Sequence, residues 1–385
     1  MRNKLLAKKV LCSVLAASVF GMAGSALAAD SAYPGKDANI TADTEYTTNG
    51  TITAGITGTG NENVTIINSD DIPETVKATI TTGATSDNLE IKDLDSLTIL
   101  TKETKSNWRS FNGILTNGSS KVIIDNVKVV NIGTEDSPVL TKKQDLAIHA
   151  LYGAVSMNVG ELNIYTGSQG IMAQNYGHDG VNIEASGDVN INSRYQSVLA
   201  YDLNSAPKDD GKAKVNINAK GTVNIVSTNV EDLDSAAVSL TNKSIQGKIE
   251  YKGKNGSEVV INGEQGINIE SSKYGVNAVV ADENADLTFS LVSKNGNVVI
   301  NSTNDGIYLS DDYDINKNNI GGNIIANNVV ISSETGAAVN SNNGNLTLAA
   351  NTVDGSVILT GADVAVQAKG NSKLTLGDAE KANNV

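Results

Sequence analysis

One pattern of 13 residues recurs between Glu161 and Asn340 and limits the folds that the chain can adopt. Each copy has an apolar residue, any residue and Ile, then Ser or Thr two positions later, then a small residue before a second apolar run. Repetition of this kind predicts a repeat architecture. The gap-free copies are ELNIYTGSQGIMA from Glu161, DVNINSRYQSVLA from Asp188, GINIESSKYGVNA from Gly266, NVVINSTNDGIYL from Asn297 and NVVISSETGAAVN from Asn328.

A sixth copy begins at Thr222 and carries four extra residues before its second apolar run. The first apolar residues of consecutive copies are separated by 27, 34, 44, 31 and 31 residues. A third strand-like run lies between copies, as in VNIEASG from Val181, VNINAKG from Val215 and LTLAAN from Leu346. Alternation of apolar and polar residues gives each of these strands one inward and one outward face.

Units of three short strands predict an all-β fold, a right-handed parallel β-helix (β-solenoid) of about three short strands per coil. Each strand would pair in parallel with its equivalent about 4.8 Å away in the next coil. We expect this β-helix over 95–385, preceded by an N-terminal cap and irregular first coils over 29–94. The length differences between copies would collect in loops at 201–214, 230–234 and 246–258. The outward asparagines of consecutive coils would stack into ladders; they are Asn163, Asn190, Asn224 and Asn268.

An antiparallel β-sandwich or barrel made of hairpins is the competing fold. Asp305-Gly306 lies between the apolar runs VVI and IYL, which is typical of a hairpin turn. The equivalent positions in the other copies carry a small residue but no consistent hairpin dipeptide. We therefore predict that Val298–Ile300 pairs in parallel with Ile267–Ile269 and Val329–Ile331, and not with Ile307–Leu309.

The first 28 residues have the features of a secretory signal peptide. Four basic residues precede an apolar run from Val10, which ends in the small-x-small sequence Ala26-Leu27-Ala28. An uncleaved membrane anchor is the alternative, although the run is short and contains Gly, Ser and Ala. We expect export, and a location at the outer-membrane surface or outside the cell.

Removal of this segment changes the composition in two ways that exclude classes of function. The only cysteine, Cys12, is lost, so disulfide frameworks and thiolate metal sites are excluded. The 29 basic residues fall to 25 against 43 acidic ones, a net charge of −18. An acidic chain of this kind is not expected to bind nucleic acid or anionic lipid through charge.

The signal peptide, the cysteine-free repetitive chain and the V-N-I-x-x-x-G/S-x-V coils together resemble the passenger region of an autotransporter (type V secretion) protein. The resemblance covers the chain from about Ala29 onward. It implies a β-helix of the pectin-lyase-like type, displayed at the outer membrane, often as an adhesin. It also implies an outer-membrane translocator β-barrel, and the chain has no C-terminal run of barrel-type strands. That barrel would be supplied in cis, beyond Val385, or in trans.

Polysaccharide lyases and glycoside hydrolases also use parallel β-helices, so a secreted carbohydrate-active enzyme is the alternative function. Such chemistry needs paired carboxylates, or clustered Asp with a base. The candidate pairs are Asp209/Asp210, Asp232/Asp234 and Asp311/Asp312, all interpreted as solvated loop charges. The only arginines after the signal peptide are Arg109 and Arg194. The only histidines are His149 and His178, and no G-x-S-x-G motif supports a serine protease.

Two further features could carry a ligand. Five tyrosines gather near the repeat corners, where corner packing is favoured over a sugar subsite; they are Tyr195, Tyr201, Tyr274, Tyr308 and Tyr313. The run DDYDINKNN (311–319) resembles the first half of a calcium loop but lacks the Gly and Glu that such a loop needs. We therefore assign no catalytic, cofactor or metal site. The sequence favours a non-catalytic, adhesin-like or structural protein that binds a protein or glycan on a host or neighbouring cell.

Overall fold

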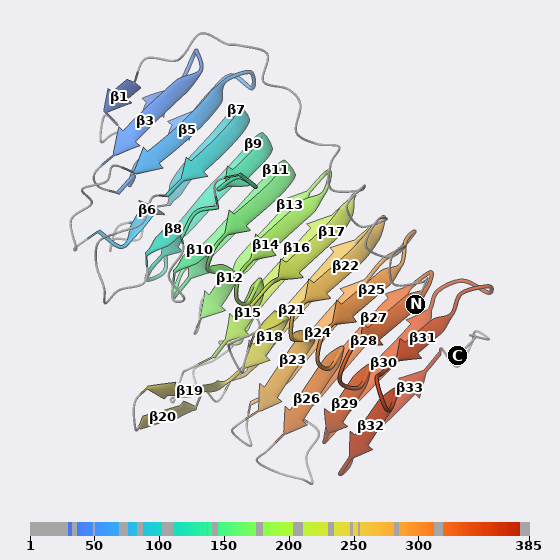
Figure 1. The fold of residues 1–385 in the computed structure, drawn as a ribbon. Helices are drawn as coiled ribbons and strands as arrows, with labels where there is room; N and C mark the ends of the chain where they lie inside the picture. The colour runs from blue at the N-terminus through green and yellow to red at the C-terminus, as the bar shows by residue number, and fades with distance from the viewer. Residues whose placement is uncertain are drawn as a thin grey trace.

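The computed structural model describes most of the chain as stacked β-strands. The described residues are 30–32, 37–48, 51–68, 76–82, 88–101, 111–136, 138–140, 145–174, 180–202, 211–229, 235–246, 249–252, 255–280, 285–311 and 319–377. These residues contain no helix, and therefore no apolar helix long enough to cross a membrane. The strands form an elongated stack that runs from β1 and β3 at one end to β31 and β33 at the other (Figure 1).

Each coil of the stack contains three short strands, which define a first, a second and a third face. In one coil these are β13 (Val181–Ala185), β14 (Val189–Ser193) and β15 (Val198–Tyr201). Each of the three pairs in parallel with its equivalent in the next coil. The structure thus confirms the predicted all-β parallel β-helix with three strands per coil.

Apart from the hairpin of β19 (Lys243–Gln246) and β20 (Ile249–Lys252), the remaining strands fall into the same three series. The first face also contains β2 (Ala38–Asn39), β4 (Ile56–Thr57), β16 (Ala213–Ala219), β21 (Ser257–Gly263), β24 (Leu287–Val292), β27 (Ile320–Ala326), β30 (Gly344–Ala350) and β33 (Lys373–Leu376). The second face also contains β1 (Asp30–Ala32), β3 (Thr44–Thr48), β5 (Asn63–Asn68), β17 (Thr222–Ser227), β22 (Gly266–Ser271), β25 (Val298–Ser302), β28 (Val329–Ser333) and β31 (Val357–Thr360). The third face also contains β6 (Ala78–Thr81), β8 (Asn112–Thr116), β10 (Leu146–Ala150), β12 (Gln169–Gln174), β18 (Ala236–Thr241), β23 (Tyr274–Val280), β26 (Ile307–Asp311), β29 (Val339–Asn342) and β32 (Val366–Lys369).

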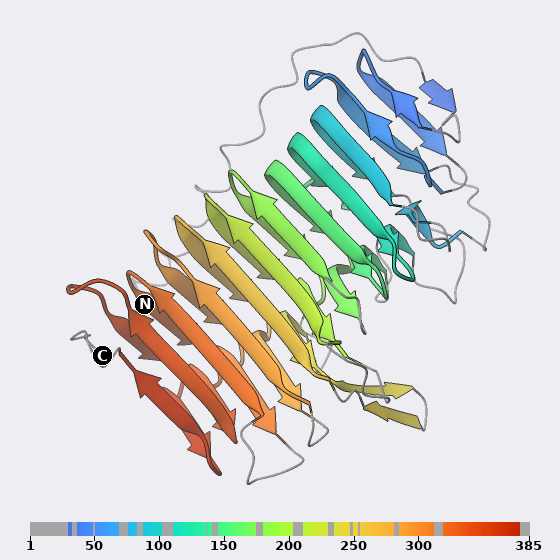
Figure 2. The same ribbon diagram turned by 180° about the vertical axis from the view of Figure 1, so that it is seen from behind.

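Three long strands continue from the first face into the second without a break. They are β7 (Leu89–Leu100), β9 (Lys121–Ile132) and β11 (Ala154–Thr166) (Figure 2). Asp93 and Asn126 have φ values of 56° and 53° at the bends of β7 and β9. Asp and Asn tolerate this left-handed conformation better than most residues. Parallel pairing already links β1 to β3, and the expected boundary between cap and β-helix at 94/95 falls inside β7.

The predicted register of the copy from Asn297 is confirmed. Val298–Ile300 pairs in parallel with Ile267–Ile269 on one side and with Val329–Ile331 on the other. Ile307–Leu309 belongs to the third face and pairs with Val276–Ala278. Asp305-Gly306 is therefore a corner between two faces. The inward Val, Ile and Leu side chains form one continuous buried core from Ile40 to Val357.

The corners need small residues because the next coil approaches closely. A Cβ added at Gly306 would lie 2.4 Å from Cγ2 of Ile331 and 2.6 Å from the carbonyl oxygen of Ala338. At the equivalent Gly170, an added Cβ would lie 2.3 Å from the carbonyl oxygen of Ser197. Close approach, and not a positive φ, thus explains these two glycines.

One predicted loop contains strands. The expected loop at 246–258 overlaps an antiparallel hairpin of β19 (Lys243–Gln246) and β20 (Ile249–Lys252). The hairpin projects from the stack in both views (Figures 1 and 2). It is an excursion between β18 and β21, and it accounts for much of the 44-residue spacing.

Candidate functional site

The second face carries an uninterrupted column of asparagine amides. Each Nδ2 donates to the Oδ1 of the asparagine one coil toward the N-terminus. The donor–acceptor distances are 3.1 Å for Asn163 to Asn131, 2.8 Å for Asn190 to Asn163, 2.8 Å for Asn224 to Asn190 and 2.9 Å for Asn268 to Asn224. The column confirms the predicted ladder and adds Asn131. It ends at Val299, which replaces asparagine in the next coil.

The first face carries a second polar column, which mixes amides with carboxylates. Asn262 donates to Oδ1 of Asn218 at 2.6 Å, and Asn218 donates to Oε1 of Glu184 at 2.6 Å. Nearer the N-terminus, Asn158 donates to Oδ1 of Asp125 at 2.8 Å. Parallel register aligns these residues on consecutive coils. The face therefore repeats hydrogen-bonding groups at the coil spacing, about 4.8 Å.

This mixed column lines an open groove of ≈ 530 Å³. The groove crosses the coils of β11, β13, β16, β21 and β24, so it follows the long axis of the stack. Five strands at about 4.8 Å make it about 19 Å long. Its polar lining residues are Asn158, Glu184, Ser186, Asn218, Lys220, Asn262, Glu264 and Lys294. A second open groove on the same face includes Ser156, Asn182, Asn216 and Lys214.

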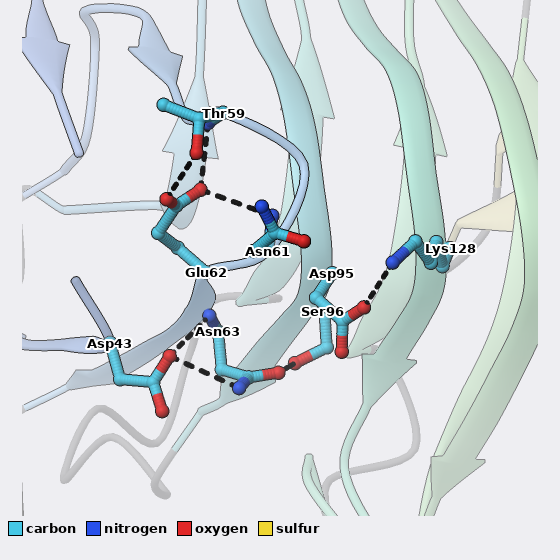
Figure 3. Close-up of polar contacts among 8 residues, drawn as sticks. All are labelled: Asp43, Thr59, Asn61, Glu62, Asn63, Asp95, Ser96 and Lys128. Atoms are coloured by element: carbon cyan, nitrogen blue, oxygen red, sulfur yellow. Dashed lines mark hydrogen bonds and ion pairs between the residues drawn. The ribbon is translucent and has the colours of Figure 1, made fainter. Parts of the chain in front are cut away.

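Among the described carboxylates, Glu62 has the most strongly shifted pKa, and it lies in a polar cluster of the first coils (Figure 3). Glu62 is 6% exposed and accepts hydrogen bonds from the Thr59 hydroxyl at 2.5 Å and the Thr59 N–H at 2.7 Å. These bonds lower the pKa of Glu62 to about 2. A general acid needs a raised pKa. Glu62 is therefore ionised at neutral pH, and its carboxylate fixes a turn.

The rest of this cluster joins neighbouring coils (Figure 3). Asp43 Oδ1 accepts hydrogen bonds from the Asn63 backbone N–H at 2.9 Å and from Asn63 Nδ2 at 3.1 Å. Ser96 donates to Asn63 Oδ1 at 2.6 Å, and Lys128 forms an ion pair with Asp95 at 2.6 Å. Asp43 and Asp95 thus hold successive coils in register through these contacts.

The carboxylate pairs predicted from sequence are only partly described. Asp209/Asp210, Asp232/Asp234 and Asp312 lie outside the described residues, as do Arg109, His178 and Tyr313. Asp311 is in β26 and is 1% exposed, so its interpretation as a solvated loop charge is wrong. It closes the strand next to the buried Asn343, whose Nδ2 donates to the Asp311 carbonyl oxygen at 3.3 Å. In the segment that resembles half of a calcium loop (311–319), only Asp311 and Asn319 are among the described residues.

The described histidine and arginine have no catalytic partners. His149 is 7% exposed, and its Nε2 lies 3.0 Å from Oε1 of Gln174. Burial lowers the pKa of His149 to about 4. Arg194 is exposed and stacks over the Tyr195 ring at 5.6 Å. Within the described ranges, no three His, Cys, Asp or Glu side chains come together in a way that could hold a metal ion.

Two of the predicted tyrosines meet on the third face. The ring centroids of Tyr274 and Tyr308 are 5.3 Å apart, and Lys273 Nζ lies 5.9 Å from the Tyr274 centroid. Both rings are partly buried, which fits the predicted corner packing. The groove lysines and Glu264 were not predicted as site residues, because they follow the first-face strands at positions outside the repeated pattern.

Comparison with known proteins adds no relative. No family model matches the chain, and neither a curated protein nor a solved structure matches it. The assignment of function therefore rests on the chain's own sequence and geometry.

Proposed function

We propose that the protein is an exported, non-catalytic, adhesin-like β-helix that binds a ligand on a host or neighbouring cell. The observation that carries this proposal is the polar first face, where a groove of hydrogen-bonding side chains crosses five consecutive coils. A repeated surface of this kind makes many equivalent weak contacts with an extended ligand, and such contacts add up through multivalency.

Three features of the sequence support the exported and surface-displayed part of the proposal. The N-terminal 28 residues have the pattern of a signal peptide, and the chain that follows lacks cysteine. The repeat pattern resembles that of autotransporter passengers. An outer-membrane translocator β-barrel, in cis or in trans, would then be the partner in secretion.

The binding proposal is tested with the purified chain from Ala29 to Val385. Labelled protein is added to epithelial cells and to diderm bacterial cells, and bound label is measured with increasing unlabelled protein as competitor. We expect saturable, competable binding without release of sugar fragments from the cell surface. Binding that does not saturate on either cell type would contradict the proposal. Release of oligosaccharides would instead support the carbohydrate-active enzyme.

A further inference from the structure

Three charged side chains occupy the same corner on consecutive coils of the groove. Ala219 pairs with Gly263, and Asn262 pairs with Val292. Lys220 and Glu264 directly follow the first pair, and Lys294 lies two residues beyond Val292. The corner therefore presents Lys220, Glu264 and Lys294 in that order along the groove. Their charges alternate with a period of two coils, about 10 Å.

The two lysines are available to a ligand. Both are exposed, and both line the groove. Within the part of the chain that the structure describes, neither ammonium group has an ion-pair or hydrogen-bond partner. By contrast, Glu264 accepts a hydrogen bond from Asn295 Nδ2 at 3.1 Å. This bond fixes the carboxylate of Glu264 at a position between the two lysines. The lysines are thus local cationic points on a strongly acidic protein.

We infer that the groove binds an extended glycan in which acidic and neutral sugar residues alternate. One sugar residue in an extended chain is comparable in length with one coil, so a disaccharide repeat spans two coils. An acidic residue would then lie opposite each lysine, and a neutral residue opposite Glu264. The carboxylate of Glu264 accepts hydrogen bonds from hydroxyl groups but repels a sugar carboxylate.

The groove fits a glycan better than a peptide. An extended polypeptide rises about 3.3 Å per residue, which does not match the coil spacing. Peptide-binding grooves also offer pockets for apolar side chains. Here eight of the eleven lining residues have amide, hydroxyl, carboxylate or ammonium side chains, and only Val292, Ala185 and Ala219 are apolar residues. Hydroxyl groups with periodic carboxylates complement such a lining.

This inference rests on the proposed binding function. Its test distinguishes a failure of the glycan inference from a failure of the proposed function. The purified chain is titrated by calorimetry, at an ionic strength of about 0.15 M, with three polymers of matched length. They are an alternating uronic acid–amino sugar glycan, a polyuronide that is acidic at every residue, and a neutral glucan. We expect the alternating glycan to bind tightest.

Two sets of variants test the role of the corner. The double variant Lys220→Gln/Lys294→Gln should weaken binding of the alternating glycan roughly tenfold, since each exposed charge pair contributes modestly. The control Lys369→Gln/Lys373→Gln makes the same charge change in the last coil and should have no effect. Glu264→Gln should raise polyuronide affinity toward that of the alternating glycan, because the repulsion is removed.

The outcomes are distinguishable because circular dichroism checks folding and the cell-binding assay runs in parallel. Equal affinity for the neutral glucan, or an unchanged affinity in the Lys220→Gln/Lys294→Gln protein, would overturn the inference while cell binding persists. Absence of cell binding by the unaltered protein would overturn the proposed function itself.

Discussion

Asn190 donates a hydrogen bond from its side-chain Nδ2 to the Oδ1 of Asn163, one coil away, over 2.8 Å. It also accepts one from Asn224 Nδ2 at 2.8 Å. Each amide in the interior of the ladder is thus both donor and acceptor, and all of the donors point toward the N-terminus. These hydrogen bonds between side chains thus link five consecutive coils, in addition to the pairing of their backbones.

Removal of one amide should weaken the ladder on both sides. Asn190→Ala loses two hydrogen bonds and leaves the partner groups on Asn163 and Asn224 unpaired, so we expect unfolding to become easier by about 1–2 kcal/mol. Chemical denaturation monitored by circular dichroism measures the change. Asn192→Ala is the matched control, because Asn192 points outward from the same strand and its side chain makes no hydrogen bond to the described residues. Equal losses in the two variants would contradict an energetic role for the ladder.

The corner at Gly306 should not accept a side chain. Gly306→Ala places a Cβ 2.4 Å from Ile331 Cγ2, and relief of this overlap should cost about 1–3 kcal/mol of unfolding free energy. Gly321→Ala serves as the control, since the nearest atom to its added Cβ is 3.7 Å away. The difference between the melting temperatures of the two variants measures the cost of this overlap. A Gly306→Ala protein as stable as the control would show that the corner adjusts freely.

His149 should make the protein sensitive to acid. The folded state holds its pKa near 4, below the value of about 6.5 expected in the unfolded chain. As pH falls from about 6.5 to about 4, the unfolded state binds the proton first, so folding loses roughly 3 kcal/mol over that window. Comparison of melting temperatures at pH 7.5 and 4.5 should show a smaller drop for His149→Gln than for the unaltered protein. The substituted glutamine can still donate a hydrogen bond to Gln174. The two proteins therefore differ chiefly in whether the side chain at position 149 binds a proton.

Glu62 should also contribute stability that is lost in acid, but at a lower pH than for His149. Its folded pKa, about 2, is lower than its ordinary value of 4.5, so the ionised form stabilises the fold above pH 4.5. That stabilisation is lost as pH falls toward 2. Glu62→Gln should therefore melt at a lower temperature than the unaltered protein at pH 7, and the difference should narrow at pH 2.5. A difference independent of pH would mean that the Thr59 contacts do not depend on charge.

The stacked strands could be predicted because their information is local and repeated. The sequence V-N-I marks inward and outward positions directly, and the outward asparagines predict the ladder from the sequence alone. The corner also followed from the sequence, because a small residue recurs at Gly170, Gly275 and Gly306 where neighbouring backbones approach. In each case several copies pointed to the same conclusion.

The features outside the repeat could not be predicted from the sequence, because only the three-dimensional register of the strands brings their residues together. Lys220, Glu264 and Lys294 are separated by 44 and 30 residues, and only the pairing of β16, β21 and β24 aligns them. The hairpin of β19 and β20 was missed because its polar residues, Lys243 and Lys252 among them, are typical of a loop. Asp311 was misplaced for a similar reason, since its charge suggested solvent although it ends a buried strand.

The coil-by-coil pairing also determines how the protein responds to force. Each coil contacts chiefly its two neighbours, so a pull on the ends of the described chain peels coils away one at a time. A coil of 31 residues releases roughly 100 Å of chain when it is fully extended. The stack would then lengthen in regular steps while the remaining coils stay folded. A stack of this kind would extend gradually under load, because the coils that have not yet been pulled away stay folded.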